Sequence, residues 1–392
     1  MNAPPKSISQ ERLASLEIGR GVAALLVVLF HYEFYTLEYL GSRASLARWF
    51  EGGHAGVEYF FALSGFIIYY VHVRDIGKTD KLSNFLAKRT VRIAPIYWVV
   101  ITSSLLALAG NPIWWAKRGL SFYSIIADYL LLPRSGQLIL EPAWTLKREA
   151  LFYAVFSLII VAPSLGFPAF ALWQAAIVVA NLFFFSLNDR PNGLLVYFFD
   201  VHNLGFGLGL GCAWFVVSVS RATIRSGVVA LLIGLLGVLG AMAFEWFADD
   251  NFAGLQSAAE EIGLSGAYTA SFTLVILGFV LLELSSGFNI ASKWKHAMVF
   301  GASSYAMYLI HDPIASVLFK IFASARFRSG LTPNKAYLLA VVMAVVASIA
   351  VHMKVEVPLT RLLRRKLVPR QEKSAAVGIG TKIDPGPAWR GE

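Results

Sequence analysis

Long runs of apolar residues, separated by short polar segments, extend along most of this 392-residue chain. A helix needs about 18 or more mostly apolar residues to cross the hydrocarbon core of a bilayer, because each residue adds only about 1.5 Å. About ten runs reach this length, so we predict an all-α polytopic membrane protein with about ten transmembrane helices. The expected spans lie near residues 19–40, 54–72, 92–110, 146–162, 169–187, 194–216, 224–244, 266–284, 298–322 and 336–355.

Three segments fall outside this pattern. Residues 1–18 are polar and lack an apolar stretch that ends in a cleavage site, so we expect an uncleaved tail whose following span acts as the signal. Residues 120–132 are apolar but too short to cross, which predicts an interfacial or re-entrant piece. Residues 359–392 are basic, and we expect them to form a disordered tail. The membrane domain is therefore 19–358, with no internal repeat and no second soluble domain.

The composition agrees with a membrane protein and sets its orientation. Hydrophobic residues make up 57% of the chain and charged residues 15%, against about 25% charged in a typical globular domain. The net charge is +10, but most basic residues lie between or beyond the apolar runs, so we expect a lipid bilayer and no nucleic acid as partner. About two-thirds of the 34 lysines and arginines fall on the side of the two termini, which predicts that both termini are cytoplasmic.

Two loops and the single cysteine refine this interpretation. The segment 245–265 is acidic and has no Lys or Arg, which is typical of an external loop, whereas the turn 163–168 is uncharged and does not indicate a side. Cys212 is the only cysteine, which excludes an intrachain disulfide and a multi-cysteine metal site. We expect it to be a small packing residue, and we expect no metal site.

The first expected span carries Arg20 at one end and His31 in its middle. Eleven residues of helix are about three turns, so the two side chains share one face roughly 16 Å apart. A titratable imidazole at mid-depth is costly unless it faces a cavity or a partner, which makes His31 a candidate functional residue. The alternative is a hydrogen bond between helices.

Two further motifs precede or enter the next spans. Arg89 and Arg92 are three residues apart, so they share a helix face at the cytoplasmic interface. Paired guanidinium groups suit a phosphate, and contact with lipid headgroups is the alternative. Ser64 and Gly65 permit close packing of the second span, and Ser64 is a weaker candidate nucleophile because no base adjoins it in the sequence.

Other polar side chains recur at helical spacing in the fourth and ninth spans. Glu149 lies one turn before Tyr153, and its carboxylate could orient an imidazole or an acceptor hydroxyl, or form a salt bridge to Lys147 or Arg148. His311 lies at mid-depth, where neighbouring hydroxyls could satisfy it. The remaining candidates lie at span ends. His54 and His72 carry little weight there, and Glu356 could pair with one of the arginines.

These motifs, taken together and in this order, resemble the bacterial acyltransferase 3 family of integral membrane O-acyltransferases. The stretch Glu17–Gly21 is also similar to the branch that decorates exopolysaccharides, the succinoglycan acetyltransferase type. The resembling motifs are Arg20–Ala24 leading to His31, Phe60–Phe66, Arg89 with Arg92–Tyr97, Trp144–Leu146 leading to Glu149 and Tyr153, and Ser304–Tyr305 leading to Tyr308 and His311.

The resemblance implies a membrane enzyme that moves an acyl group, usually acetyl from acetyl-CoA, to a hydroxyl of an exported or envelope glycan. It assigns the essential histidine to His31 and important basic positions to Arg20, Arg89 and Arg92. Some members add an SGNH domain, for which the tail after Arg370 is too short, so we expect the membrane domain or a partner to complete the transfer. Polysaccharide biosynthesis or export proteins are the partners that it suggests, and the bacterial inner membrane is the location.

The hypothesis that follows has acyl-CoA as donor substrate, with no bound cofactor. The three arginines would hold its phosphates, and His31 would act as general base on the acceptor hydroxyl. The glycan would enter near Trp144 and Glu149, and we expect Ser64, Tyr153 and His311 to contact substrate. An acyl intermediate on His31 or Ser64 remains open beside direct transfer. A transporter or flippase for a lipid-linked glycan is the main alternative, and a scaffold of an export complex is the third.

Overall fold

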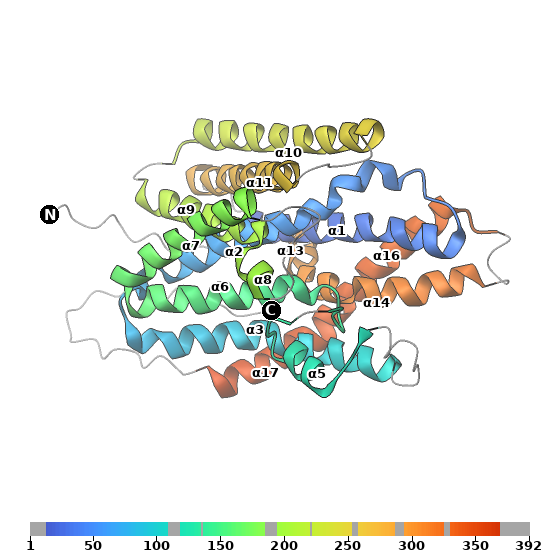
Figure 1. Ribbon diagram of the computed structural model, residues 1–392, viewed down its shortest axis with the longest axis horizontal. Helices are drawn as coiled ribbons and strands as arrows, with labels where there is room; N and C mark the ends of the chain where they lie inside the picture. Colours follow the sequence, from blue (N-terminus) through green and yellow to red (C-terminus); the bar gives the residue numbers. More distant parts are fainter. Residues whose placement is uncertain are drawn as a thin grey trace.

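The computed structural model describes residues 13–108, 118–134, 136–184, 194–219, 222–252, 258–286, 294–324 and 330–368. Within these ranges the chain forms helices and contains no strand, as the apolar runs predict, and most helices run along the long axis of the molecule (Figure 1). The α-helices are α1 (Ala14–Leu40), α2 (Gly56–His72), α3 (Leu82–Leu108), α5 (Phe122–Tyr129), α6 (Ala143–Val161), α7 (Pro163–Phe183), α8 (Leu194–Phe199), α9 (Leu204–Ser218), α10 (Ile224–Phe252), α11 (Ala258–Ser286), α13 (Lys295–Ala302), α14 (Ser304–Ala323), α16 (Pro333–Val351) and α17 (Val357–Leu367). The shorter 3₁₀ segments are η1 (Ala47–Ala55), η2 (Val73–Asp75), η3 (Thr79–Lys81) and η4 (Val201–Asn203), and η5 (His352–Glu356) is a π-helix.

The described residues contain nine helical segments that are long and apolar enough to cross a membrane, and they match nine of the ten expected spans. The remaining expected span, 146–162, is the 19-residue helix α6. Its first half carries three consecutive charged residues, Lys147, Arg148 and Glu149, whereas the apolar stretch of each of the other nine holds at most two. The protein is an all-α polytopic membrane protein, and the charges of α6 belong to the site described below.

Several expected boundaries are wrong, because hydropathy does not detect helical turns that continue beyond the hydrocarbon core. Helix α3 begins at Leu82, so Arg89 and Arg92 lie within it. Glu245 lies in α10 and Ser265 in α11, so the expected external loop is largely helical. Helix α1 begins at Ala14, inside the expected N-terminal tail.

The expected disordered tail also begins too early. Helix α17 extends to Leu367 and ends on three basic residues, Arg364, Arg365 and Lys366, which are favourable at a helix C-terminus. The rest of that predicted tail, from residue 369, lies outside the described residues. The short piece at 120–132 contains α5, which packs against α3 through a hydrogen bond of 2.7 Å from the Tyr97 hydroxyl to the Asp128 carbonyl.

Helices α2 and α9 cross at very close range, which confirms that Gly65 serves packing. A Cβ atom at Gly65 would come within 2.2 Å of the Phe206 carbonyl oxygen, and one at Gly209 within 1.8 Å of the Ala62 carbonyl oxygen. Cys212, on the same helix α9, is buried, as expected of a small packing residue. This contact brings the segment before α9 against the start of α2.

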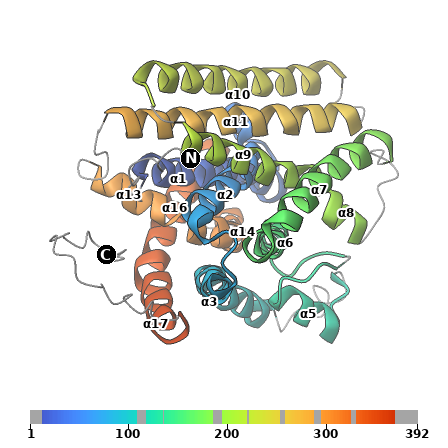
Figure 2. The same ribbon diagram turned by 90° about the vertical axis from the view of Figure 1, so that its left-hand side faces the viewer.

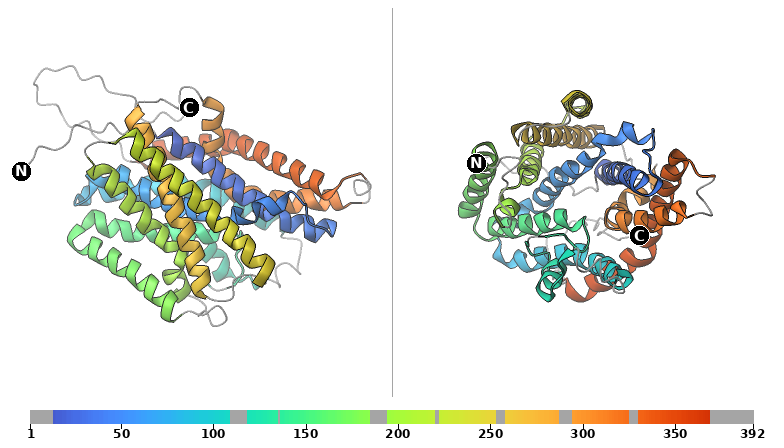
Figure 3. Two further views of the ribbon diagram at one scale, coloured as in Figure 1. Left: turned by 90° about the horizontal axis from the view of Figure 1, so that it is seen from above. Right: turned by 45° about the vertical axis from the view of Figure 1, so that its right-hand side comes forward.

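The helices form layers around a polar centre. Helices α10 and α11 lie on one outer side, and α3, α5 and α17 lie on the opposite side (Figure 2). Helices α1, α2, α6 and α14 lie between these two sides, and α10 lies at the outer edge again in the right-hand view of Figure 3. Most of the residues singled out by the sequence come from the helices of the middle and from α3.

Candidate functional site

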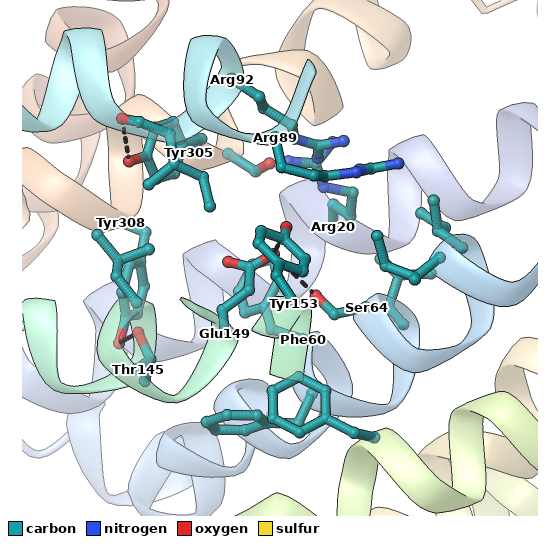
Figure 4. A pocket seen from close by; sticks show the side chains of 18 of the residues that line it. Arg20, Phe60, Ser64, Arg89, Arg92, Thr145, Glu149, Tyr153, Tyr305 and Tyr308 are labelled. Carbon is teal, nitrogen blue, oxygen red and sulfur yellow. Dashed lines mark hydrogen bonds between the residues drawn. The ribbon is translucent and has the colours of Figure 1, made fainter. Parts of the chain in front are cut away.

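A pocket between α1, α2, α3, α6 and α14 brings together six residues that the sequence singles out (Figure 4). Its basic groups are Arg20 from α1 and Arg89 and Arg92 from α3, and we call it the arginine pocket. The other residues that line it are Val57, Phe60, Phe61, Leu63, Ser64, Ile67, Ile68, Ile93, Thr145, Leu146, Glu149, Tyr153, Phe206, Ser304, Tyr305 and Tyr308.

The three guanidinium groups make the arginine pocket positive. Arg20 pairs with Glu17 one turn before it, at 3.4 Å between Nη1 and Oε1, and the Arg89 guanidinium lies 5.8 Å from the centre of the Tyr153 ring. Glu149 is the one carboxylate among the residues that line the pocket. Like charges held together at low dielectric repel strongly, so this arrangement favours an anionic ligand with several acceptor oxygens.

Arg89 is held by a histidine to which the sequence analysis attached little weight. Nη2 of Arg89 lies 3.1 Å from Nε2 of His72, and Nδ1 of His72 lies 2.8 Å from a carboxylate oxygen of Asp75. The guanidinium can only donate, so Nε2 of His72 accepts and Nδ1 carries the hydrogen. The spacing of His72 and Asp75 was visible in the sequence, but the proximity of Arg89 was not.

Glu149 is the centre of a small network in the arginine pocket. Ser64 Oγ donates to Oε1 of Glu149 at 3.3 Å, and the Tyr153 hydroxyl donates to the same oxygen (Figure 4). The alternative salt bridges of Glu149 are absent from the described pairs, because Lys147 binds Asp128 at 2.8 Å and Arg148 binds Asp200 at 2.5 Å.

A second pocket, of about 230 Å³, adjoins the first and is lined by His31, His54, His202 and His311. We call it the histidine pocket. Val57 and Tyr308 line both pockets, so the two are adjacent. The remaining lining residues are Phe30, Val57, Glu58, Glu141, Pro142, Trp144, Tyr308 and Asp312.

His31 presents one ring nitrogen to the histidine pocket. Its Nδ1 lies 2.8 Å from the Val27 carbonyl oxygen, one turn back on α1. A carbonyl only accepts, so Nδ1 carries the hydrogen and Nε2 of the neutral ring has a free lone pair. No contact links Glu149 to this imidazole in the described hydrogen bonds, and the two residues line different pockets.

His311 lies beside His31, with the ring centres 5.1 Å apart. The neighbouring hydroxyls do not satisfy it, contrary to the sequence-based alternative. Its Nδ1 donates to the Tyr308 carbonyl at 2.7 Å, while the Tyr308 hydroxyl is bonded to Thr145 Oγ1 at 3.0 Å. Nε2 of His311 has no hydrogen-bond partner in the described chain, although Asp312 Oδ1 lies 3.4 Å away.

The other two histidines of this pocket come from segments that the sequence analysis did not connect with it. His54 Nε2 lies 2.7 Å from Glu245 Oε1, so the start of α2 is tied to α10. His202 Nδ1 lies 2.6 Å from Asp200 Oδ1. Trp144, an expected substrate contact, packs against His202 with ring centres 5.2 Å apart.

Glu356 does not show the pairing expected for it. Its carboxylate lies 2.8 Å from Nδ1 of His352, four residues earlier in the π-helix η5. This bond joins the two ends of the π-turn, at the junction of α16 and α17. No ion pair within 4.0 Å joins Glu356 to Arg20, Arg89 or Arg92 among the described residues, although the charge of Glu356 still acts on Arg20 and Arg92.

Comparison with known proteins decides the family. A profile described as an acyltransferase domain matches residues 13–353. The chain belongs to the acyltransferase 3 family. The match covers every helix that contributes to the two pockets. No solved structure matches the chain.

Two curated relatives of this acyltransferase 3 chain cover it to different extents. The exopolysaccharide production protein ExoZ of Rhizobium meliloti (strain 1021) is 28% identical over 339 residues, which are 81% of this chain and 92% of ExoZ. The O-acetyltransferase OatA of Staphylococcus aureus (strain NCTC 8325 / PS 47) is 22% identical over 385 residues, which are 91% of this chain. This match spans 58% of the length of OatA.

Proposed function

We propose that this acyltransferase 3 protein transfers an acyl group, acetyl from acetyl-CoA, to a hydroxyl of a cell-surface or exported glycan. The observation that carries the proposal is the adjacency of the arginine pocket and the histidine pocket, which share Val57 and Tyr308 as walls. An anion-binding pocket beside a pocket with a free imidazole nitrogen suits a phosphorylated donor and a hydroxyl acceptor. The family and the names of OatA and ExoZ support the same reaction.

The donor end of the reaction belongs to the arginine pocket. Arg20, Arg89 and Arg92 bind the phosphates of acyl-CoA, because guanidinium groups match phosphate oxygens with paired hydrogen bonds. The apolar residues of the same pocket accommodate the arm that carries the thioester. Arg20 and His31 are about 16 Å apart along α1, so an extended arm leads the thioester from the arginines toward the imidazole.

His31 acts as general base in this proposal. Its Nε2 takes the proton of the acceptor hydroxyl while the hydroxyl oxygen forms a bond to the thioester carbonyl carbon. The carbon–sulfur bond breaks, and the protonated imidazole returns the proton to the leaving thiolate. The reaction yields an O-acyl ester and free coenzyme A. Glu149, Tyr153 and Ser64 line the arginine pocket, which binds acyl-CoA. The hydrogen bonds from Tyr153 and Ser64 to Glu149 hold these side chains in place, so that they guide the thioester into position.

The charge pattern supports an orientation for this chemistry. Both termini and the segment between α2 and α3 would lie in the cytoplasm of a bacterium, with the protein in its inner membrane. Acyl-CoA then reaches the arginines from the cytoplasm, and the glycan reaches Trp144 from the outer side. Proteins of polysaccharide biosynthesis or export are the partners that would supply the acceptor.

The deciding experiment is an analysis of the cell's own glycans. Mass spectrometry and proton NMR would compare a deletion strain with strains complemented by wild type, by His31→Ala, and by His296→Ala, an exposed histidine on α13. We expect an ester-linked acyl group to disappear on deletion and to return with wild type and His296→Ala only, at equal membrane abundance.

Two results would overturn the proposal. Full acylation with His31→Ala would remove His31 from catalysis. The second result is a glycan that keeps its acyl groups on deletion but decreases outside the cell or accumulates inside it. This result would favour the transporter alternative instead.

A further inference from the structure

Glu58 is a buried carboxylate that the proposed reaction does not use. It lies at the start of α2, is only 3% exposed and lines the histidine pocket. Its Oε1 accepts a hydrogen bond of 3.4 Å from Ser265 Oγ, whereas Oε2 has no hydrogen-bond partner in the described part of the chain. A buried carboxylate oxygen without a donor destabilises the fold, so a ligand that donates to Oε2 stabilises this arrangement.

The Glu58 carboxylate is held in place by a chain of charged groups. Nε2 of His202 lies 3.5 Å from Glu58 Oε1, and Nδ1 of the same ring is bonded to Asp200. Asp200 in turn is bonded to Arg148 at 2.5 Å. The close crossing of α2 and α9 brings this chain against Glu58. Oε1 of Glu58 is therefore held by its neighbours, whereas Oε2 can accept a hydrogen bond from a ligand.

The two pockets differ in the kind of hydrogen bond that they offer. The charged groups of the arginine pocket are mainly guanidinium donors, whereas the histidine pocket offers acceptors, among them Glu58 Oε2 and the Nε2 atoms of His31 and His311. The phosphates and the thioester of acyl-CoA contain no hydrogen-bond donor, and the arm between them offers only two amide N–H groups and one hydroxyl, spread along its length. A polyhydroxylated sugar offers several O–H donors, and Trp144 lines the same pocket, where an aromatic side chain suits the apolar face of a sugar.

A metal ion is the other ligand that an open carboxylate could take. The described residues contain no group of three or more His, Cys, Asp or Glu arranged to hold one. The ring nitrogens nearest to Glu58 are those of His202, which already bonds Asp200 through Nδ1. A sugar hydroxyl therefore satisfies Glu58 better than a cation does.

We propose that Glu58, held by Ser265 and His202, binds a second hydroxyl of the sugar acceptor beside the hydroxyl that His31 deprotonates. The inference rests on the proposed function and extends it to acceptor selection. The enzyme then favours a sugar unit that presents two hydroxyls to this pocket, one for reaction and one for recognition.

The test is a transfer assay with purified full-length protein, labelled acetyl-CoA, and the unacylated glycan isolated from the deletion strain. Glu58→Gln keeps the shape of the side chain and removes its charge, so we expect the KM for the glycan to rise about tenfold or more. The KM for acetyl-CoA should stay within about twofold of wild type. Glu38→Gln, an exposed glutamate on α1, is the matched control.

The outcomes separate this inference from the proposed function. If wild type transfers no acetyl group, the proposed function fails and takes the inference with it. If wild type is active and Glu58→Gln has an unchanged KM for the glycan, the inference alone is overturned, as it is if only the KM for acetyl-CoA rises. His202→Asn provides a second variant, for which we expect a smaller rise in the same KM. Thermal unfolding of each variant verifies that it is folded.

Discussion

Arg89 donates from Nη2 to Nε2 of His72 across 3.1 Å, in a part of the bundle where both side chains are almost inaccessible to solvent. Asp75 holds the other nitrogen of this imidazole at 2.8 Å. The three residues form a chain from the segment after α2 to the arginine pocket. A guanidinium fixed in this way keeps one orientation toward an anionic ligand.

We expect His72→Asn to weaken donor binding. The shorter amide side chain cannot reach both Asp75 and Arg89, so Arg89 loses its fixed orientation while its charge remains. The KM for acetyl-CoA should rise about three- to tenfold, with a smaller change in kcat and none in the KM for the glycan. A steady-state assay with purified protein measures both. His296→Asn is the matched control, and equal KM values for His72→Asn and wild type would show that His72 does not position Arg89.

The hydroxyl of Ser64 distinguishes direct transfer from an acyl-serine intermediate. Ser64 Oγ donates to Glu149, and no histidine lines the arginine pocket to act as its base. We therefore expect Ser64→Ala to keep at least about a tenth of the wild-type kcat, and Glu149→Gln to lose more, because Tyr153 also depends on Glu149. Abolished transfer in a stably folded Ser64→Ala protein would instead support an acyl-serine route, which trapping of labelled enzyme could verify.

Asp128 stabilises the connection between α5 and α6. Its carboxylate receives two hydrogen bonds from Arg134, at 2.8 and 2.7 Å, and another from Lys147 at 2.8 Å. Asp128→Asn removes the carboxylate that the buried side chains of Arg134 and Lys147 share, so we expect the free energy of unfolding to fall by about 3 kcal/mol or more. Thermal unfolding in detergent measures this. Asp80→Asn, on the exposed segment η3, should change nothing.

The carboxylate of Asp128 also makes the free energy of unfolding depend on pH. Burial raises the pKa of Asp128, but the hydrogen bonds from Arg134 and Lys147 outweigh it and hold the pKa below its usual value. A lowered pKa in the folded state contributes stability above about pH 4, and this contribution is lost as the pH falls through the folded value. The wild-type Tm should therefore fall below about pH 4 more steeply than that of Asp128→Asn. Parallel curves for the two proteins would contradict this.

The crossing of α2 and α9 depends on Gly209. An added methyl group would meet the Ala62 carbonyl oxygen at 1.8 Å, so Gly209→Ala must push the helices apart. We expect a clear loss of thermal stability, together with reduced transfer, since α2 and the segment before α9 carry Glu58 and His202. Gly211→Ala, two residues later on the same helix, meets nothing within 4 Å and should be neutral or slightly stabilising. Equal Tm values for the two variants would show that the contact is not required.

The sequence by itself determined the helical membrane architecture, because long apolar runs have no other stable form in a bilayer. It also determined that Arg20 and His31 share one face of α1, since both lie on one regular helix. The placement of Arg89 and Arg92 on a common face followed in the same way. These conclusions depend only on the regular geometry of a single helix, which fixes how residues a few turns apart are oriented.

Only the tertiary structure decided which helices meet, because contacts between residues far apart in the chain depend on side-chain packing that periodicity does not contain. It brought Glu58 to His202 across the α2–α9 crossing, and it separated Glu149 from His31 into neighbouring pockets. It also gave His72 a partner in Arg89, where the sequence showed only a histidine near the end of a span. The arginine pocket, with its hydrogen-bond donors, and the histidine pocket, with its hydrogen-bond acceptors, exist only in the packed bundle. Each of them takes its residues from at least four separate segments.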